Sequence, residues 1–315
     1  MTPEHGIRTD SPASPAADAA HSRATLGKAA AENFPVAPFF LPRAWRQGLT
    51  AVYGYARLVD DIGDGDLAPG GRDAVLLGLD PAAADDPLAM LDAFEADLLR
   101  VFGGADGPPR HPLLLALRPV VRDRGLTPEP FLGLIEANRQ DQRVTRYETY
   151  ADLLAYCELS ANPVGRLVLS LTGTSTPERV RRSDAICTAL QIAEHLQDVA
   201  EDLGRDRVYL PAQDMRRFHV SETDLKAPTA GASVRALVAF EAERARALLD
   251  EGTPLVGSVH GRLRLLLAGF VGGGRAALRA VGAAGFDVLP GPPKPTKTGL
   301  LREVAAVLRT APRKG

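Results

Sequence analysis

The sequence predicts an all-α protein that folds as a single helical bundle. Apolar residues recur at helical spacing through most of the chain, and the alternation that marks a β-strand is scarce. Prolines and glycines interrupt this pattern at intervals that suit loops between helices. The clearest breaks are Asp80-Pro81, Gly103 to Pro109, Thr127-Pro128 and Pro290 to Pro295. None of them resembles a linker between domains, so one domain is expected.

These breaks set the order and bounds of the expected helices. The expected helix 87–102 lies between the breaks at Asp80-Pro81 and Gly103. Another helix starts at Thr127-Pro128, and the proline run at 290–295 separates the last two helices of the chain. The expected helices cover residues 42–63, 87–102, 111–123, 128–143, 149–172, 177–203, 211–217, 233–250, 254–283 and 297–309. Residues 1–22 are rich in small residues and proline, so we expect a disordered leader followed by a helical domain over 23–312.

Composition excludes several classes of protein. The chain has 315 residues, of which 45% are hydrophobic, and a formal net charge of -2. This balance and the lack of a lysine-rich tract argue against nucleic acid as a partner. With no apolar signal region and no long uninterrupted apolar run, we expect a cytoplasmic protein whose membrane contact, if any, is peripheral to the inner membrane. Cys157 and Cys187 are expected to be reduced core thiols.

Two acidic clusters are the most informative feature of the chain. Asp60-Asp61-x-x-Asp64 and Asp198-x-x-Glu201-Asp202 each follow an apolar, helix-like stretch and lie far apart in the sequence. Carboxylates four residues apart fall on one face of a helix, about one turn from each other. Such oxygen ligands suit magnesium, which also takes phosphate oxygens. The alternative is that both clusters lie on solvated helix faces. The apolar surroundings favour a metal-binding or catalytic role, because it costs free energy to remove a carboxylate without a partner from water.

Arginines accompany both clusters. Tyr53, Arg57, either Asp60 or Asp61, and Asp64 follow helical steps, and Arg57 could pair with phosphate oxygens or simply with Asp61 one turn later. On the second helix the stripe contains Cys187, Gln191, Glu194, Asp198 and Asp202. Arg205 and Arg207 follow it, where they could close over a diphosphate or merely stabilise a helix C-terminus.

Several motifs together carry a family resemblance. They are Asn33-Phe34-Pro35-Val36-Ala37, Asp60-Asp61-Ile62-Gly63-Asp64, Arg139-Gln140-Asp141, Arg146-Tyr147, Tyr156-Cys157, Ser160 to Arg166, and Gln197 to Asp202 with Arg207 to Pro211. In order and spacing these motifs resemble the squalene/phytoene synthase family over roughly residues 25–285. The N-F-P-V opening and the S-A-N-P-V-G segment are most similar to the bacterial hydroxysqualene synthase branch of hopanoid biosynthesis.

The resemblance implies a fold and a reaction. It implies a class I isoprenoid (terpenoid) synthase bundle with a long apolar cavity and a magnesium cluster, manganese being an alternative metal. The branch implies conversion of presqualene diphosphate and water to hydroxysqualene and diphosphate, without NADPH. It also implies a prenyl diphosphate substrate and association with other hopanoid-pathway enzymes.

Site residues follow from the resemblance by position. Metal ligands are expected at Asp60, Asp61, Asp64, Asp198, Glu201 and Asp202, with Glu194 added, and catalytic residues at Tyr53, Arg57, Asp141, Tyr147, Asn162, Arg207 and Tyr209. Glu194 departs from the asparagine usual in the family, so it either adds a magnesium ligand or pairs with an arginine. Asp206 stands where glycine is common, which predicts a stiffer or differently charged lid.

Aromatic and polar residues complete the expected chemistry. Tyr53, Tyr147, Phe34 and Phe131 are candidate walls for a carbocation pocket, because ring faces stabilise cations. Asn162 or Tyr147 would orient the water that captures the final cation.

Three alternatives remain. The chain could condense two farnesyl diphosphates head to head to presqualene diphosphate or squalene, or it could be a phytoene synthase. It could be an all-α magnesium-dependent nucleoside triphosphate pyrophosphohydrolase, although such enzymes are usually shorter. It could also be a non-catalytic partner of another synthase, against which the intact acidic clusters argue.

Overall fold

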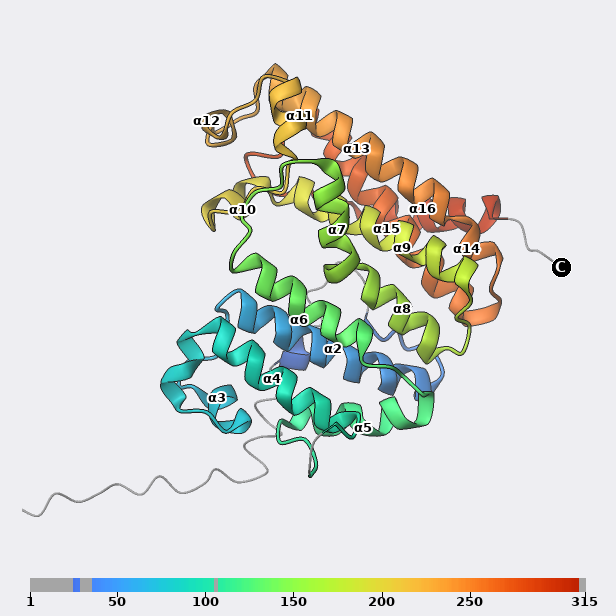
Figure 1. The fold of residues 1–315 in the computed structure, drawn as a ribbon. Coiled ribbons are helices and arrows are strands. Elements are labelled where there is room, and N and C mark those ends of the chain that lie inside the picture. The colour runs from blue at the N-terminus through green and yellow to red at the C-terminus, as the bar shows by residue number, and fades with distance from the viewer. Residues whose placement is uncertain (1–24, 29–35, 105–106, 312–315) are drawn as a thin grey trace, which may run out of the picture.

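The computed structural model describes residues 25–28, 36–104 and 107–311 of the chain (Figure 1). Within these ranges the protein is all-α, as the sequence predicts, and extended pairing is confined to one isolated bridge between Arg146 and Val208. The predicted leader, residues 1–22, and the candidate wall Phe34 lie outside the described residues.

After a helical turn at 25–28, the helices follow in chain order. They are α2 (Arg43–Gly63), α3 (Arg72–Leu77), the 3-10 helix η2 (Pro81–Asp85), α4 (Pro87–Val101), α5 (Pro112–Arg124), α6 (Glu129–Asp141), α7 (Tyr150–Ser160), α8 (Asn162–Leu171), α9 (Pro177–Gln197), α10 (Val199–Gly204), α11 (Ala212–Arg217), α12 (Glu222–Leu225), α13 (Ala232–Gly252), α14 (Pro254–Gly257), α15 (Gly261–Ala283) and α16 (Lys297–Thr310).

The bundle has two halves joined by a short pair of helices. In Figure 1, α2, α4, α5 and α6 pack together in one half, and α9, α13, α15 and α16 pack together in the other. Helices α7 and α8 lie between the halves and contact both α6 and α9. The C-terminal end of α2 therefore faces the C-terminal end of α9 across the junction, and these two ends carry the acidic clusters.

Local sequence explains where most helices begin. Asp86, Thr176 and Thr296 cap α4, α9 and α16 by accepting a backbone N–H of the first turn, and proline follows the cap directly in the first two. At α7, Thr149 and Asp152 form a reciprocal capping box. These are signals that a sequence displays directly, and the corresponding helix starts agree with those predicted.

The structure corrects three predicted helices, each of which is broken in two. The predicted helix 149–172 divides into α7 and α8 at Ala161, because Pro163 cannot donate the next helical hydrogen bond. The predicted helix 177–203 divides into α9 and α10 at Asp198, whose φ of -105° and ψ of 14° are not helical. The predicted helix 254–283 divides into α14 and α15, and α3, η2 and α12 were not predicted.

Helix α15 is a core helix. By length and composition it is the one helix of the described chain that could cross a membrane, but 61% of its apolar window is buried inside the bundle. The two cysteines also belong to the interior: Cys157 is buried, Cys187 is half-buried, and both are free thiols, which agrees with the prediction. Burial raises the pKa of each thiol to about 12.

A glycine contact between α15 and α16 makes a test of the packing. A Cβ at Gly272 would lie 2.8 Å from the backbone nitrogen of Val304 and 2.9 Å from its Cα, so the helices would have to separate. Gly272→Ala should lower the free energy of unfolding by about 1–3 kcal/mol, measured by urea denaturation. Gly269→Ala is the matched control, because no atom lies within 4 Å of its Cβ position. The control should be neutral or stabilising by about 0.5–1 kcal/mol, and equal losses would contradict the close-contact explanation.

Candidate active site

A cavity of about 370 Å³ lies at the junction of the two halves. Its lining residues come from α2, α6, α7, α9 and α10 and from the segment that follows α10. They are Arg57, Asp60, Asp64, Asp66, Leu134, Asn138, Asp141, Tyr156, Ser160, Gln191, Glu194, His195, Asp198, Glu201, Asp202, Arg205, Arg207 and Tyr209. Eight of these are carboxylates and three are arginines, so the lining carries a large excess of negative charge.

The first acidic cluster enters the cavity from the end of α2. Asp60 and Asp64 line the cavity, and the side-chain amide of Asn138 on α6 donates a hydrogen bond to Asp60 at 3.3 Å. Although the Asp60 side chain is partly open to solvent, the surrounding protein displaces water around it and raises the pKa of its carboxyl to about 7. The charges of Asp64 and Glu194 act in the same direction, and the hydrogen bond from Asn138 and the charge of Arg57 act against it. Protein alone therefore does not fully compensate the charge at this position.

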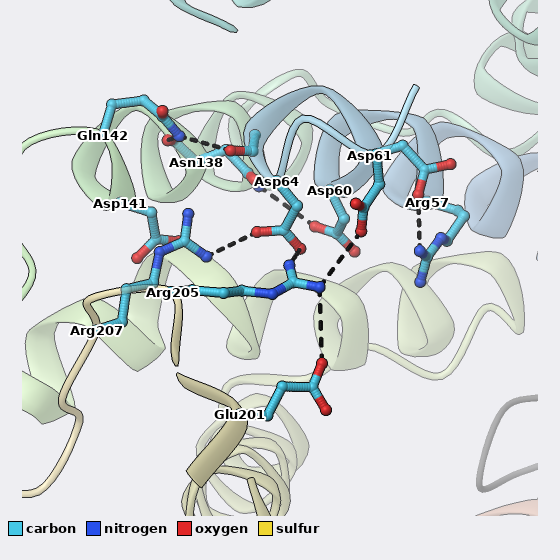
Figure 2. Close-up of polar contacts among 12 residues, drawn as sticks. Arg57, Asp60, Asp61, Asp64, Asn138, Asp141, Gln142, Glu201, Arg205 and Arg207 are labelled. Carbon is cyan, nitrogen blue, oxygen red and sulfur yellow. Dashed lines mark hydrogen bonds and ion pairs between the residues drawn. The ribbon is translucent and has the colours of Figure 1, made fainter. Parts of the chain in front are cut away.

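Asp61 points away from the cavity. Its carboxylate lies 2.7 Å from Arg57 and 2.7 Å from Lys28, which comes from the N-terminal turn. The side chain is 4% exposed and does not line the cavity, and Figure 2 shows its contact with Arg57. The Arg57–Asp61 ion pair that the sequence offered as an alternative is thus present, and Asp61 lies behind the first cluster as a partner of two cations.

The second acidic cluster faces the first from the junction of α9 and α10. Asp198, Glu201 and Asp202 all line the cavity, as does Glu194 one turn earlier on α9. Burial raises the pKa of Asp198, and the neighbouring charges of Asp202 and Glu201 raise it further. These carboxylates repel one another, as expected of a site that receives a cation.

Two arginines that follow α10 contact the first acidic cluster, and Arg205 also contacts the second (Figure 2). Arg207 lies 2.7 Å from Asp64, and Arg205 lies 3.3 Å from Asp64. Arg205 also lies 3.6 Å from Glu201 on the opposite side and 3.6 Å from Asp66. The residues after α10 therefore hold the two halves together across the cavity mouth.

Asp141 is fixed in the cavity wall by tyrosines. It accepts hydrogen bonds from Tyr156 at 2.8 Å and from Tyr209 at 3.1 Å. Burial raises its pKa, while the hydrogen bond from Tyr156 and the charge of Arg207 lower it. His195 stacks on Tyr209 with ring centroids 3.7 Å apart. These contacts orient Tyr209 and fix the Asp141 carboxylate in the wall of the cavity.

The segment after α10 is anchored to the loop between α6 and α7. The Val208 amide donates to the Thr145 carbonyl at 2.9 Å, and Arg146 lies 2.8 Å from Asp206 and 2.6 Å from Glu222. Asp206 has a φ of 59°, the left-handed conformation that favours glycine. Asp206 thus forms a specific ion pair with Arg146, and the stiffer or differently charged lid stays a prediction.

The cavity collects ten of the fourteen residues predicted for the site. These are Arg57, Asp60, Asp64, Asp141, Glu194, Asp198, Glu201, Asp202, Arg207 and Tyr209, whereas Tyr53, Asp61, Tyr147 and Asn162 do not line it. Tyr147 is buried, accepts a hydrogen bond from Gln140 and stacks beside Tyr209. Asn162 is buried between α8 and α9, where it accepts from Thr188 at 3.0 Å. Their proposed water-orienting role stays a prediction.

Phe131 is a core residue that packs against other aromatic rings. It is fully buried, its ring meets Tyr55 edge to face at 5.0 Å, and its carbonyl accepts from the Tyr55 hydroxyl at 2.9 Å. It does not line the carboxylate cavity, in which Leu134 is the one aliphatic residue. The long apolar cavity and its aromatic walls remain a prediction.

Sequence reasoning gave no role to several residues that the cavity includes, among them Asn138, His195 and Ser160. Asn138 supports Asp60, His195 supports Tyr209, and the Ser160 hydroxyl lies at the end of α7. Asn138 was detectable, because it precedes Asp141 by three residues and so shares its helix face. It also explains Gly63, since a Cβ there would lie 1.9 Å from the Asn138 Oδ1 atom.

The cavity fits a divalent cation by charge and by donor type. In the described parts of the chain, no group of three or more Asp, Glu, His or Cys side chains is already gathered closely enough to hold a metal. The carboxylates are instead held apart and partly neutralised by arginines. Carboxylate oxygens are the donors that magnesium prefers, and Asp60, Asp64, Asp198, Glu201 and Asp202 supply them from both sides.

Comparison with known proteins identifies the family. The model of the squalene/phytoene synthase family matches residues 28–299. The chain belongs to the squalene/phytoene synthase family. The all-α isoprenoid synthase fold is that of solved family structures: a squalene synthase from Alicyclobacillus acidocaldarius is 40% identical, with a TM-score of 0.72 over 87% of this chain and 97% of that one. A dehydrosqualene synthase in complex with a ligand is 25% identical, with a TM-score of 0.76 over 93% and 97%.

Two kinds of family member are similar in sequence. A hydroxysqualene synthase of Rhodopseudomonas palustris is 33% identical over 72% of this chain and 71% of its own length. A 15-cis-phytoene synthase of Synechococcus elongatus is 30% identical over 70% of both chains. Family membership thus confirms a synthase of the squalene/phytoene type and leaves the particular reaction to be proposed.

The positive φ of Asp206 gives a test of the lid segment. Asp206→Ala and Asp206→Gly both remove the carboxylate that meets Arg146, but only alanine retains the cost of the left-handed backbone. Alanine should therefore be the less stable variant by about 1 kcal/mol. Hydrogen exchange at the Val208 amide should be fastest in the alanine variant. Equal exchange in the two variants would show that the backbone conformation carries no cost.

Proposed function

We propose that this protein converts presqualene diphosphate and water to hydroxysqualene and diphosphate in a magnesium-dependent reaction. The observation that carries the proposal is one cavity that is lined by two facing acidic clusters and by three arginines. Acidic side chains can bind a diphosphate only through cations, and arginines bind its oxygens directly. The similarity to hydroxysqualene synthases favours this reaction within the family.

Magnesium would be held by Asp60 and Asp64 on one side and by Asp198, Glu201 and Asp202 on the other. When bound, it would neutralise the diphosphate and make it a better leaving group. Glu194 faces the same space and is either a further ligand or a neighbour that strengthens the negative potential.

The arginines of the chain would bind and position the leaving group. Arg205 and Arg207 now pair with Asp64 at the cavity mouth, where they are partly exposed. A diphosphate in the cavity gives these guanidinium groups partners of higher charge with matching oxygen geometry. If the two guanidinium groups moved from Asp64 to the diphosphate, the Asp64 carboxylate would become free to bind the metal. The arginines would then stabilise the negative charge that develops on the diphosphate as its bond to carbon breaks.

The side chains around Asp141 would hold this part of the cavity wall in a fixed conformation. Tyr156 and Tyr209 each donate to Asp141, and the stacking of His195 fixes the ring of Tyr209. Burial raises the pKa of both tyrosines, so their hydroxyls stay protonated and keep donating. A fixed wall of this kind would limit the access of bulk water to the carbocation that forms when the diphosphate leaves.

Product analysis tests the reaction. Purified protein with magnesium and presqualene diphosphate should give hydroxysqualene by mass spectrometry, at the same rate with and without a nicotinamide nucleotide. Efficient turnover of farnesyl diphosphate alone would instead support head-to-head condensation, which the similarity to phytoene synthases makes the second candidate. Hydrolysis of nucleoside triphosphates, with neither prenyl substrate consumed, would overturn both.

Carboxylate substitutions test the cavity. Asp60→Asn and Asp198→Asn should each lower magnesium-dependent diphosphate release by about 100-fold or more, because each removes a charged ligand from a different side. Chelation of the metal should reduce the wild type to a similar level. Asp123→Asn is the matched control, since Asp123 is exposed on α5 and pairs with Arg122. Wild-type rates in both cavity variants, folded by circular dichroism, would contradict the proposal.

A further inference from the structure

A second cavity, of about 480 Å³, lies outside the catalytic site between the end of α15 and the start of α16. Its charged lining residues are all basic: Arg279, Lys294 and Arg302. Thr296 and Thr298 add hydroxyl groups, and Ala280 belongs to its apolar floor. We call this cavity the basic pocket. Its combination of cations above an apolar floor suits an anion that carries hydrocarbon.

The positive charge of the basic pocket is only partly compensated. Glu303 lies 2.5 Å from Arg279 and 3.8 Å from Arg302, and the charge of Lys294 acts on Asp198 of the second acidic cluster. The two arginine side chains remain 58% and 61% exposed, so a ligand that approaches from solvent can contact them directly. A protein with a net charge of -2 thus concentrates cations on this face.

The outer face of α16 continues the same surface. Thr298, Leu301, Arg302, Ala305 and Arg309 are exposed and follow helical spacing, and none of them is acidic. Leu301 is 68% exposed, although it is a large aliphatic residue. Basic residues beside an exposed aliphatic side chain are typical of a helix that lies on an anionic membrane surface.

The basic pocket is connected to the catalytic cavity. The side-chain amide of Gln197, next to Asp198, donates to the Pro293 carbonyl at 2.5 Å. Pro293 and Lys294 therefore lie beside the second acidic cluster while also lining the basic pocket. A surface bound to the basic pocket would lie close to the second acidic cluster.

We propose that the basic pocket and the exposed face of α16 bind the headgroups of anionic phospholipids in a bilayer. Lys294, Arg279 and Arg302 would meet the phosphate of a headgroup, and Leu301 would enter the interfacial region. Charge complementarity supplies most of the attraction, so binding should weaken as salt increases. This inference stands apart from the proposed reaction, because it concerns a surface and can be measured without turnover.

Vesicle sedimentation tests the proposal. The wild type should sediment with phosphatidylcholine vesicles that contain phosphatidylglycerol and not with pure phosphatidylcholine vesicles. The double variant Lys294→Glu/Arg302→Glu should bind at least about tenfold more weakly, because two attractions become repulsions. Leu301→Ala should weaken binding with no change of charge. Circular dichroism checks folding, and Lys294→Gln/Arg302→Gln, expected to weaken binding to a smaller extent, serves if the reversal does not fold.

A matched control separates the site from general electrostatics. Arg118→Glu/Arg122→Glu makes the same charge change on exposed positions of α5, in the other half of the bundle (Figure 1), and should bind within about twofold of the wild type. Equal losses in the two double variants would overturn the proposal, as would failure of the wild type to bind anionic vesicles. Calorimetric binding of free inorganic phosphate or diphosphate at the basic pocket, without vesicle binding, would also overturn it and assign the pocket to a soluble anion.

Discussion

Repulsion between like charges is the constraint on which the rest of this structure depends. The end of α2 and the junction of α9 with α10 carry carboxylates that face one another across a small cavity. Neither cluster would hold this position alone, since each gains by moving toward bulk water. The packing of two helical halves keeps them together, and Arg205, Arg207 and Asn138 reduce the cost. The residual negative charge is a property that suits the cavity to cations.

The contact between α8 and α9 shows how that packing is achieved. A Cβ at Gly165 would lie 2.3 Å from Ser183 Oγ and 2.6 Å from Cys187 Sγ, so a larger residue would require both side chains to move. Arg166 binds Asp184 through two nitrogens, and Asn162 accepts from Thr188. The segment from Ser160 to Arg166, which resembles the family so strongly, therefore fastens α8 to the helix that carries the second acidic cluster.

Sequence reasoning succeeded where a residue's role depends on its own helix. The acidic clusters, the arginines beside them and most helix starts follow from local spacing and capping. It failed where the role depends on a distant element: nothing in the spacing of Asp60, Asp61 and Asp64 shows that Asp61 turns toward Lys28. The break at Asp198 was also invisible, because no proline or glycine marks it. Family resemblance supplied the pairing of distant motifs that periodicity could not.

The contact between Lys28 and Asp61 bears on how short the protein can be made. Lys28 precedes α2 by fifteen positions and lies in a turn that has no other charged contact with the first acidic cluster among the described residues. A chain that began after residue 28 would leave Asp61, with a side chain 4% exposed, to Arg57 alone. Arg57 would then be held more firmly to Asp61 and be less available to a phosphate. The amino-terminal boundary chosen for expression is thus a variable of the active site as well as of solubility.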